Sequence, residues 1–135
     1  MNIEILKNLT PSQIEQIEGF ITHHPHGNFF QSPQAFQFFN SVDHFEPVLI
    51  VAKKNRKITG LLMTVFMENG VGLKRFFSRR CIVWGGPLIN SDDTQTIPLL
   101  LLELNRIAKK KAIYIETRNL FDSSNFKKCF SEYRL

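Results

Sequence analysis

The chain has 135 residues, 43% of them hydrophobic, which is enough to bury one core without help from disulfides or metals. This composition excludes a disordered chain, a collagen-like repeat and two separate domains within these residues. The net charge is +5, from 17 Lys and Arg against 12 Asp and Glu, less than a dedicated nucleic-acid-binding protein usually carries. The charge is uneven: residues 1–52 carry one base and five acids, whereas residues 53–118 carry thirteen bases and five acids.

The two cysteines, Cys81 and Cys129, lie outside any Cys-x-x-Cys spacing, so neither a zinc ribbon nor a redox pair is indicated. We expect both to be reduced thiols in the core. The N-terminus lacks a basic segment followed by a long apolar run, and the apolar stretches are shorter than the roughly 18 residues of a membrane span. The sequence therefore predicts a cytoplasmic protein without a membrane span.

The first elements are a strand and two helices. Residues 2–7 alternate apolar and polar side chains and predict a short strand. Residues 10–13, Thr-Pro-Ser-Gln, have the form of a capping box and predict a helix that ends near residue 24. Ser32 followed by Pro33 predicts the start of a second helix.

A strand-rich segment comes next. The apolar runs 48–52 and 58–67 flank a charged tip and predict an antiparallel hairpin covered on both faces. Residues 73–84 predict a third, longer strand, which Gly85-Gly86-Pro87 ends.

The last predicted elements are a helix over residues 94–110, with acids at its start, a strand over 112–117 and a helix that begins near residue 122. The order β-α-α-β-β-β-α-β-α predicts an α/β (α+β) fold with a mixed sheet and helices on both faces. A sheet of this kind would ordinarily receive one or two further strands after the last helix, so we expect these strands to be missing. An unpaired sheet edge there would favour a homodimer.

Basic residues gather in the predicted third strand. If residues 73–84 are extended, Arg75 and Arg79 share one face, and Lys74 and Arg80 point to the opposite side. Two interpretations remain open: a solvated strand end, or a phosphate-binding surface for a nucleotide-linked or tRNA-type partner.

Other groups that could carry chemistry are few. Glu116 lies near the end of a predicted buried strand, where it is either a general base or the ion-pair partner of Arg118. His23, His24 and His26 are close in sequence, but the first two point in different directions on a helix. We therefore expect a polar helix end there and no metal site.

The turn at residues 85–87 is the only glycine-rich connection between a predicted strand and a helix. Backbone amides at such a place can hold an anion. However, Pro87 removes one N–H, and Asp92 and Asp93 lie at the start of the following helix. The sequence favours a tight structural turn over an anion cradle.

Three segments carry a resemblance to a known family. Residues 24–32 (His-Pro-His-Gly-Asn-Phe-Phe-Gln-Ser), 81–88 (Cys-Ile-Val-Trp-Gly-Gly-Pro-Leu) and 113–119 (Ile-Tyr-Ile-Glu-Thr-Arg-Asn) resemble the first half of the Fem-type aminoacyltransferases. These enzymes have two GNAT-like (N-acetyltransferase-like) domains and build peptidoglycan cross-bridges. They transfer amino acids from aminoacyl-tRNA to the peptide of a lipid- or nucleotide-linked muropeptide.

The resemblance implies that residues 1–135 form one GNAT-like domain, the acceptor-binding half of a two-domain acyltransferase. Such a domain would need no cofactor, would be inactive alone and would meet aminoacyl-tRNA only through the second domain. Its acceptor would be a muropeptide or another amine. The residues expected to line the acceptor cleft are Gln31, Arg75, Arg79, Trp84, Gly86, Pro87 and Arg118.

The sequence departs from the pattern at two places. Acetyl-CoA-dependent GNAT enzymes hold pyrophosphate with a Q/R-x-x-G-x-G/A loop, where this chain has residues 84–88, Trp-Gly-Gly-Pro-Leu. A Lys and an acid that contact the muropeptide in the family fall near Phe39 and Asn90, so the acceptor can be a different amine.

Two alternatives stand beside this hypothesis. One is a minimal acetyl-CoA-dependent N-acetyltransferase with Glu116 as base. The other is a non-catalytic module whose basic middle segment binds RNA or an anionic glycopolymer; that module would lose affinity steeply with salt.

Overall fold

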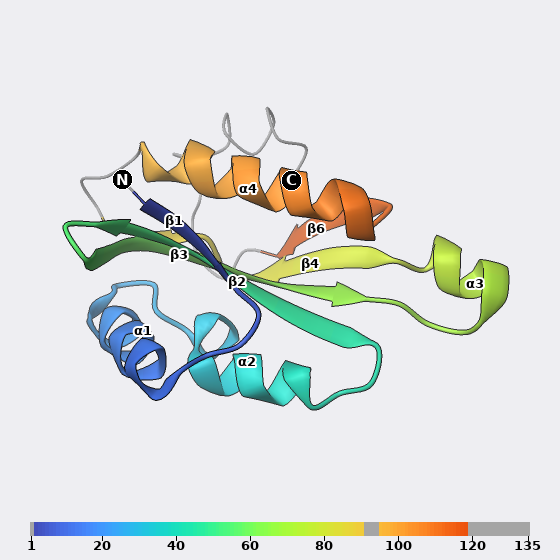
Figure 1. Cartoon of the computed structure of the whole chain (residues 1–135), viewed down its shortest axis with the longest axis horizontal. Helices are drawn as coiled ribbons and strands as arrows, with labels where there is room; N and C mark the ends of the chain where they lie inside the picture. Colours follow the sequence, from blue (N-terminus) through green and yellow to red (C-terminus); the bar gives the residue numbers. More distant parts are fainter. Residues whose placement is uncertain (1, 91–94, 119–135) are drawn as a thin grey trace.

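The computed structural model describes residues 2–90 and 95–118 and consists of one mixed sheet with helices on both of its faces (Figure 1). The sheet order is β1-β2-β3-β4-β6, with the short β5 also paired to β3. All pairs are antiparallel except β4 with β6, which is parallel. The strands are β1 (Asn2–Leu6), β2 (Phe45–Lys54), β3 (Lys57–Met67), β4 (Arg80–Trp84), β5 (Leu88–Ile89) and β6 (Tyr114–Arg118).

The helices cover the sheet unequally. Helices α1 and α2 pack on one face and α4 packs on the other, while the short α3 projects from the end of the sheet (Figure 1). Alternate residues of the interior strand β2 therefore enter two cores: Val48 and Ile50 face α4, and Leu49 and Val51 face α1 and α2. The helices are α1 (Pro11–His23), the 3₁₀ turn η1 (Phe29–Gln31), α2 (Pro33–Asn40), α3 (Gly72–Phe77) and α4 (Thr96–Lys111).

This architecture confirms the predicted mixed α/β fold, the hairpin and the first two helices. The capping box is present: Thr10 accepts a hydrogen bond from the backbone N–H of Gln13, whose side chain accepts one from the Thr10 N–H. Ser32 accepts a hydrogen bond from the Ala35 N–H and begins α2, with Pro33 as its first residue. Among the described residues, no helix is both long and apolar enough to cross a bilayer.

The strand predicted over residues 73–84 is wrong, because its first half is the helix α3. Gly70 and Gly72 both adopt positive φ, which turns the chain sharply out of the ladder. The Ser78 hydroxyl then donates to the Asn69 carbonyl and accepts from the Asn69 N–H, which closes the segment at its base. Only residues from Arg80 onward pair with β3.

Two smaller differences concern the region after β4. Strand β5 was not predicted; it pairs with Gly60 and Leu61 of β3 after the chain has passed through the turn at residues 85–87. Helix α4 begins at Thr96, two residues later than predicted. The acids at 92–93 and the helix predicted from residue 122 lie outside the described residues, as does Cys129.

Candidate functional site

The centre of the candidate site is the buried amide of Gln31, which fills a gap in the sheet. Strand β3 pairs with β4 at residues 65–67 and with β5 at residues 60–61, so Met63 lies between the two partners. The Gln31 side chain donates to the Met63 carbonyl (3.2 Å) and accepts from the Met63 N–H (2.7 Å). It also donates to the Trp84 carbonyl at 2.7 Å. Gln31 thus replaces the missing strand residue and holds the end of β4 in place.

A second amide, that of Asn28, fixes the glycine turn after β4. Its Nδ2 donates to the Gly85 carbonyl at 2.9 Å, and its Oδ1 accepts from the Phe30 N–H at 3.0 Å. A Cβ atom on Gly85 would lie 2.7 Å from the Asn28 side chain, and one on Gly86 would lie 2.7 Å from that of Gln31. Because they lack a Cβ atom, the two glycines allow the Asn28 and Gln31 amides to approach the backbone closely. This arrangement favours a tight structural turn over an anion cradle.

Asn28 was not singled out from the sequence as a site residue. Asn28 directly precedes the 3₁₀ turn η1, and its side chain accepts a hydrogen bond from the Phe30 N–H two residues later. This position is typical of an Asn that caps a turn. His24, the first residue after α1, also reaches across the molecule: its Nε2 lies 2.5 Å from the Ile89 carbonyl oxygen. The segment from α1 to α2 is thereby joined to both ends of the glycine turn.

Aromatic rings surround the end of β4. The indole of Trp84 stacks on Phe39 with centroids 5.4 Å apart and planes 8° apart, and Phe30 lies on it at 5.8 Å. The guanidinium of Arg118 lies over the same indole at 5.7 Å. Trp84 is half-buried and Arg118 is exposed, so solvent reaches both of these side chains.

The Glu116 carboxylate is paired with Arg118. Nε and a terminal nitrogen of Arg118 lie 3.2 and 3.4 Å from the two carboxylate oxygens. This two-point contact is the geometry of a structural ion pair. Of the two interpretations of Glu116, the arrangement favours the ion pair with Arg118 over the general base.

The structure divides the residues predicted to line one cleft into two groups at opposite ends of β4. Trp84, Gly86, Pro87 and Arg118 lie at one end, with the fully buried Gln31 behind them. The other end of this five-residue strand lies about 13 Å away by the rise of an extended chain. Because Gln31, Gly86 and Pro87 are buried, they hold the first group in place and do not form its surface.

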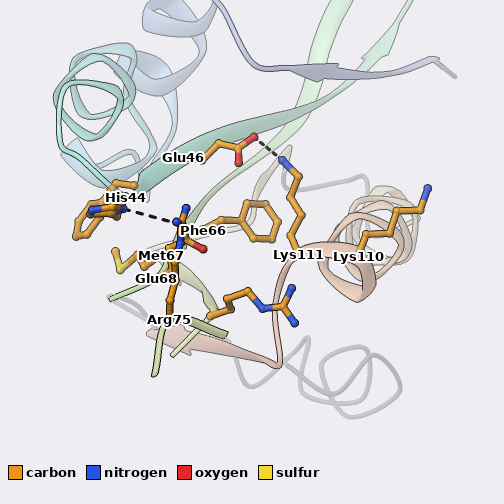
Figure 2. A pocket seen from close by; sticks show the side chains of 10 residues that line it. His44, Glu46, Phe66, Met67, Glu68, Arg75, Lys110 and Lys111 are labelled. Carbon is orange, nitrogen blue, oxygen red and sulfur yellow. Dashed lines mark hydrogen bonds and ion pairs between the residues drawn. The ribbon is translucent and has the colours of Figure 1, made fainter. Parts of the chain in front are cut away.

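The second group consists of basic residues near the start of β4. Their predicted arrangement on the two faces of one strand is wrong. Lys74 and Arg75 are in α3, Arg79 is in the turn after it, and only Arg80 is in β4. Arg75 and Arg79 line a pocket of about 440 Å³ together with Lys110 and Lys111 from the end of α4 (Figure 2). Its acids, Glu46 and Glu68, are paired with Lys111 and Arg75.

The ion pair between Glu68 and Arg75 changes the pKa of the Glu68 carboxyl group. The Arg75 guanidinium donates from Nε at 2.7 Å, and this hydrogen bond lowers the pKa of Glu68 below its ordinary value. Further charge from Arg75 and from His44 acts in the same direction.

No group of three His, Cys, Asp or Glu side chains in the described part of the chain is arranged to hold a metal ion. Cys81 is a buried free thiol, as predicted. Burial raises its pKa to about 11, partly opposed by a hydrogen bond with the Thr64 hydroxyl. The thiol therefore stays protonated at neutral pH and is no nucleophile.

Comparisons with known proteins identify the fold. No protein-family model matches the sequence, and no curated protein matches it. A solved aminoglycoside N-acetyltransferase, AAC(6')-Iy in complex with CoA, is 11% identical with a TM-score of 0.65, covering 98% of this chain and 89% of that one. A ribosomal-protein-alanine N-acetyltransferase from Brucella melitensis biovar Abortus 2308 is 9% identical with a TM-score of 0.64, covering 98% and 90%.

The structure of FemX also matches, with 15% identity and a TM-score of 0.70. The match covers 96% of this chain but 31% of FemX, so this chain spans about a third of that protein's length. At these identities the likeness concerns the fold alone. The protein has a GNAT-like fold.

Proposed function

We propose that this protein is the acceptor-binding GNAT-like domain of a Fem-type aminoacyl- or acyltransferase and that it acts in the cytoplasm. One observation carries the proposal: the three segments that resemble the family meet in one hydrogen-bonded unit. Residues 24–32 reach 81–88 through the Asn28 and Gln31 amides. Residues 81–88 reach 113–118 through the Gly85 N–H and the Arg118 carbonyl, 2.8 Å apart.

The solvent-accessible side of this unit suits an amine acceptor that also carries an anionic group. Arg118 pairs with Glu116 through Nε and one terminal nitrogen, and its remaining guanidinium N–H groups can donate to a carboxylate or phosphate. Trp84 offers an aromatic edge beside it. In the proposal, the acceptor is a lipid- or nucleotide-linked muropeptide or a related amine, and aminoacyl-tRNA would be handled by a further domain.

The turn after β4 argues against a pyrophosphate site. Asn28 and Gln31 occupy the space next to Gly85 and Gly86, and Pro87 has no N–H to donate. A loop that cradles phosphate needs glycine amides open to the ligand. We therefore expect the domain to bind the acceptor without acetyl-CoA and to transfer no acyl group by itself.

Calorimetric titration of the full chain with a nucleotide-linked muropeptide and, separately, with acetyl-CoA tests the proposal. We expect the muropeptide alone to bind, and Arg118→Ala to weaken that binding at least ten-fold. Arg106→Ala is the matched control, since Arg106 is also exposed and also paired with a glutamate, Glu103. Transfer of an acyl or aminoacyl group by this chain alone, or muropeptide binding that Arg118→Ala leaves unchanged, would contradict the proposal.

A second candidate is a minimal acetyl-CoA-dependent N-acetyltransferase. The observation in its favour is that two of the solved structures that share the fold are N-acetyltransferases, one of them in complex with CoA. Micromolar binding of acetyl-CoA in the same titration would favour this candidate over the first.

A further inference from the structure

The end of the molecule around α3 exposes an unusual number of apolar side chains. Leu73, Phe76 and Phe77 have the i, i+3, i+4 spacing of one helix face, and Val71 precedes them. Val71 is 82% exposed, Leu73 75% and Phe77 66%. Ile113 and Tyr114 are also exposed and lie at the base of α3, where the Ile113 N–H donates to the Arg79 carbonyl.

This surface, the α3 tip (Val71, Leu73, Phe76 and Phe77), projects beyond the rest of the sheet (Figure 1). Six of the ten exposed large hydrophobic side chains among the described residues belong to the tip or to its base. A contiguous exposed apolar surface of this kind marks a place where something binds.

Positive charge surrounds the tip. Residues 68–80 contain four basic side chains and one acid. Arg79 lies against the Phe76 ring, with its guanidinium carbon 4.2 Å from the centroid. The pocket behind α3 adds Lys110 and Lys111 from the end of α4 (Figure 2). A projecting apolar turn is therefore bordered by basic residues of α3, of the turn after it and of the end of α4, although Arg75 and Lys111 are paired with Glu68 and Glu46.

We propose that the α3 tip docks the protein on an anionic phospholipid surface, with the apolar side chains inserted at the headgroup level and the basic residues against lipid phosphates. Aliphatic and aromatic side chains bordered by Lys and Arg are what such an interface takes up. This inference does not depend on the proposed transferase function.

The shape of the tip favours a membrane over a macromolecular partner. A stable protein interface uses roughly 20–30 residues on each side, whereas the tip is one helical turn with four apolar side chains. Single-stranded nucleic acid stacks its bases on aromatic rings, which gives no role to the exposed aliphatic residues Val71 and Leu73. A lipid surface uses both the apolar and the basic groups.

Flotation of the full chain with phosphatidylcholine vesicles, with and without 30% phosphatidylserine, tests this surface. We expect binding only to the anionic vesicles, and we expect 1 M salt to weaken it, because the Debye length falls to about 3 Å. Phe76→Ser with Phe77→Ser should reduce the partition coefficient at least ten-fold. Lys74→Gln should reduce the partition coefficient roughly five-fold, which is the contribution expected from one basic residue near an anionic surface.

Matched controls come from elsewhere on the surface. Phe29→Ser with Phe38→Ser removes two aromatic side chains that are 54% and 56% exposed, and Lys54→Gln removes an exposed charge from the last residue of β2. Neither control should change vesicle binding. Fluorescence of the single tryptophan, Trp84, which lies at the far end of β4, checks that each variant is folded.

Three results would overturn the proposal. The first is no binding to anionic vesicles by the unmodified chain. The second is equal loss of binding in the α3-tip variant and in the Phe29/Phe38 control. The third is self-association of the chain, without vesicle binding, that disappears in the α3-tip variant, since the tip would then contact a second copy.

Discussion

The two ends of β4 are built on different principles. At the Trp84 end, the buried amide of Gln31, the partly buried amide of Asn28 and stacked rings hold the backbone, and two glycines allow the close approach. At the Arg80 end, the chain leaves the sheet into α3, and the contacts are exposed ion pairs such as Glu68–Arg75. Buried hydrogen bonds are costly to break, whereas exposed ion pairs add little stability.

This difference separates two kinds of surface on one strand. The Trp84 end is rigidly defined and suits a site that must position a small acceptor. The Arg80 end offers charge and exposed apolar area, which suit attachment to an extended surface. Substitutions at the two ends should therefore affect stability very differently.

Gln31→Leu should have the largest effect. Leucine has a similar size but leaves the Met63 N–H, the Met63 carbonyl and the Trp84 carbonyl without the partners that Gln31 provides. We expect the free energy of unfolding to fall by about 4 kcal/mol, measured by urea denaturation followed by Trp84 fluorescence. Gln37→Leu, at an exposed position of α2, should change it by less than about 0.5 kcal/mol. Equal effects would mean that the Gln31 amide does not hold the sheet.

The pH dependence of stability that Cys81 contributes shows whether β4 is already buried one residue after Arg80. Because burial raises its folded-state pKa from 9.0 to about 11, the unfolded chain loses the thiol proton first as the pH rises. The stabilisation is complete below pH 9 and disappears as the pH rises to 11, a loss of about 2 to 3 kcal/mol. The measurement is the difference in unfolding free energy between the unmodified chain and Cys81→Ala from pH 8 to pH 11. A constant difference over that range would show that the thiol is not desolvated.

Gly86→Ala tests the close approach at the glycine turn. The added Cβ would lie 2.7 Å from the Gln31 side chain, which three hydrogen bonds prevent from moving away. We expect a loss of about 2 kcal/mol, the usual cost of overpacking, by the same denaturation measurement. Gly19→Ala in α1, where a Cβ meets nothing within 4 Å, should instead stabilise by about 0.5 kcal/mol or more. A neutral Gly86→Ala would show that the turn tolerates a side chain.

Local sequence signals were sufficient to predict most elements. The Thr10 capping box, the Ser32–Pro33 helix start and the two apolar runs of the hairpin each depend on neighbouring residues, and each is confirmed. Local rules failed at residues 73–77, where Leu73, Phe76 and Phe77 have helical spacing but expose their apolar face. Hydrophobic patterns indicate burial in most segments, and this segment departs from that rule.

The candidate site was only partly predictable. Gln31, Trp84 and Gly86 were predicted to line one cleft through the family resemblance, and they lie close together, since the amide of Gln31 binds the Trp84 carbonyl and faces Gly86. Arg75 and Arg79 were grouped with them because an extended segment over residues 73–84 would put both on one face, as part of a phosphate-binding surface. Which end of a strand a residue lies at depends on long-range strand pairing. The bend at Gly70 and Gly72 moves the two arginines away from the Trp84 end, and the distribution of charge along the sequence does not predict such a bend.

The smallest effect is expected at the Arg80 end, from Arg75→Gln. Loss of the guanidinium removes the hydrogen bond that lowers the pKa of Glu68, so this pKa should rise towards its ordinary value of 4.5, as measured by carbon NMR titration of the carboxylate. A carboxyl group whose folded-state pKa is lowered stabilises the fold above its unfolded pKa and loses that contribution as the pH falls. Because this pair lies at the protein surface, with half of the Arg75 side chain exposed, the urea midpoint at pH 7 should not change measurably. A clear drop in that midpoint would show that α3 is held to the sheet by this pair, and the contrast between the two ends of β4 would then be weaker than the packing indicates.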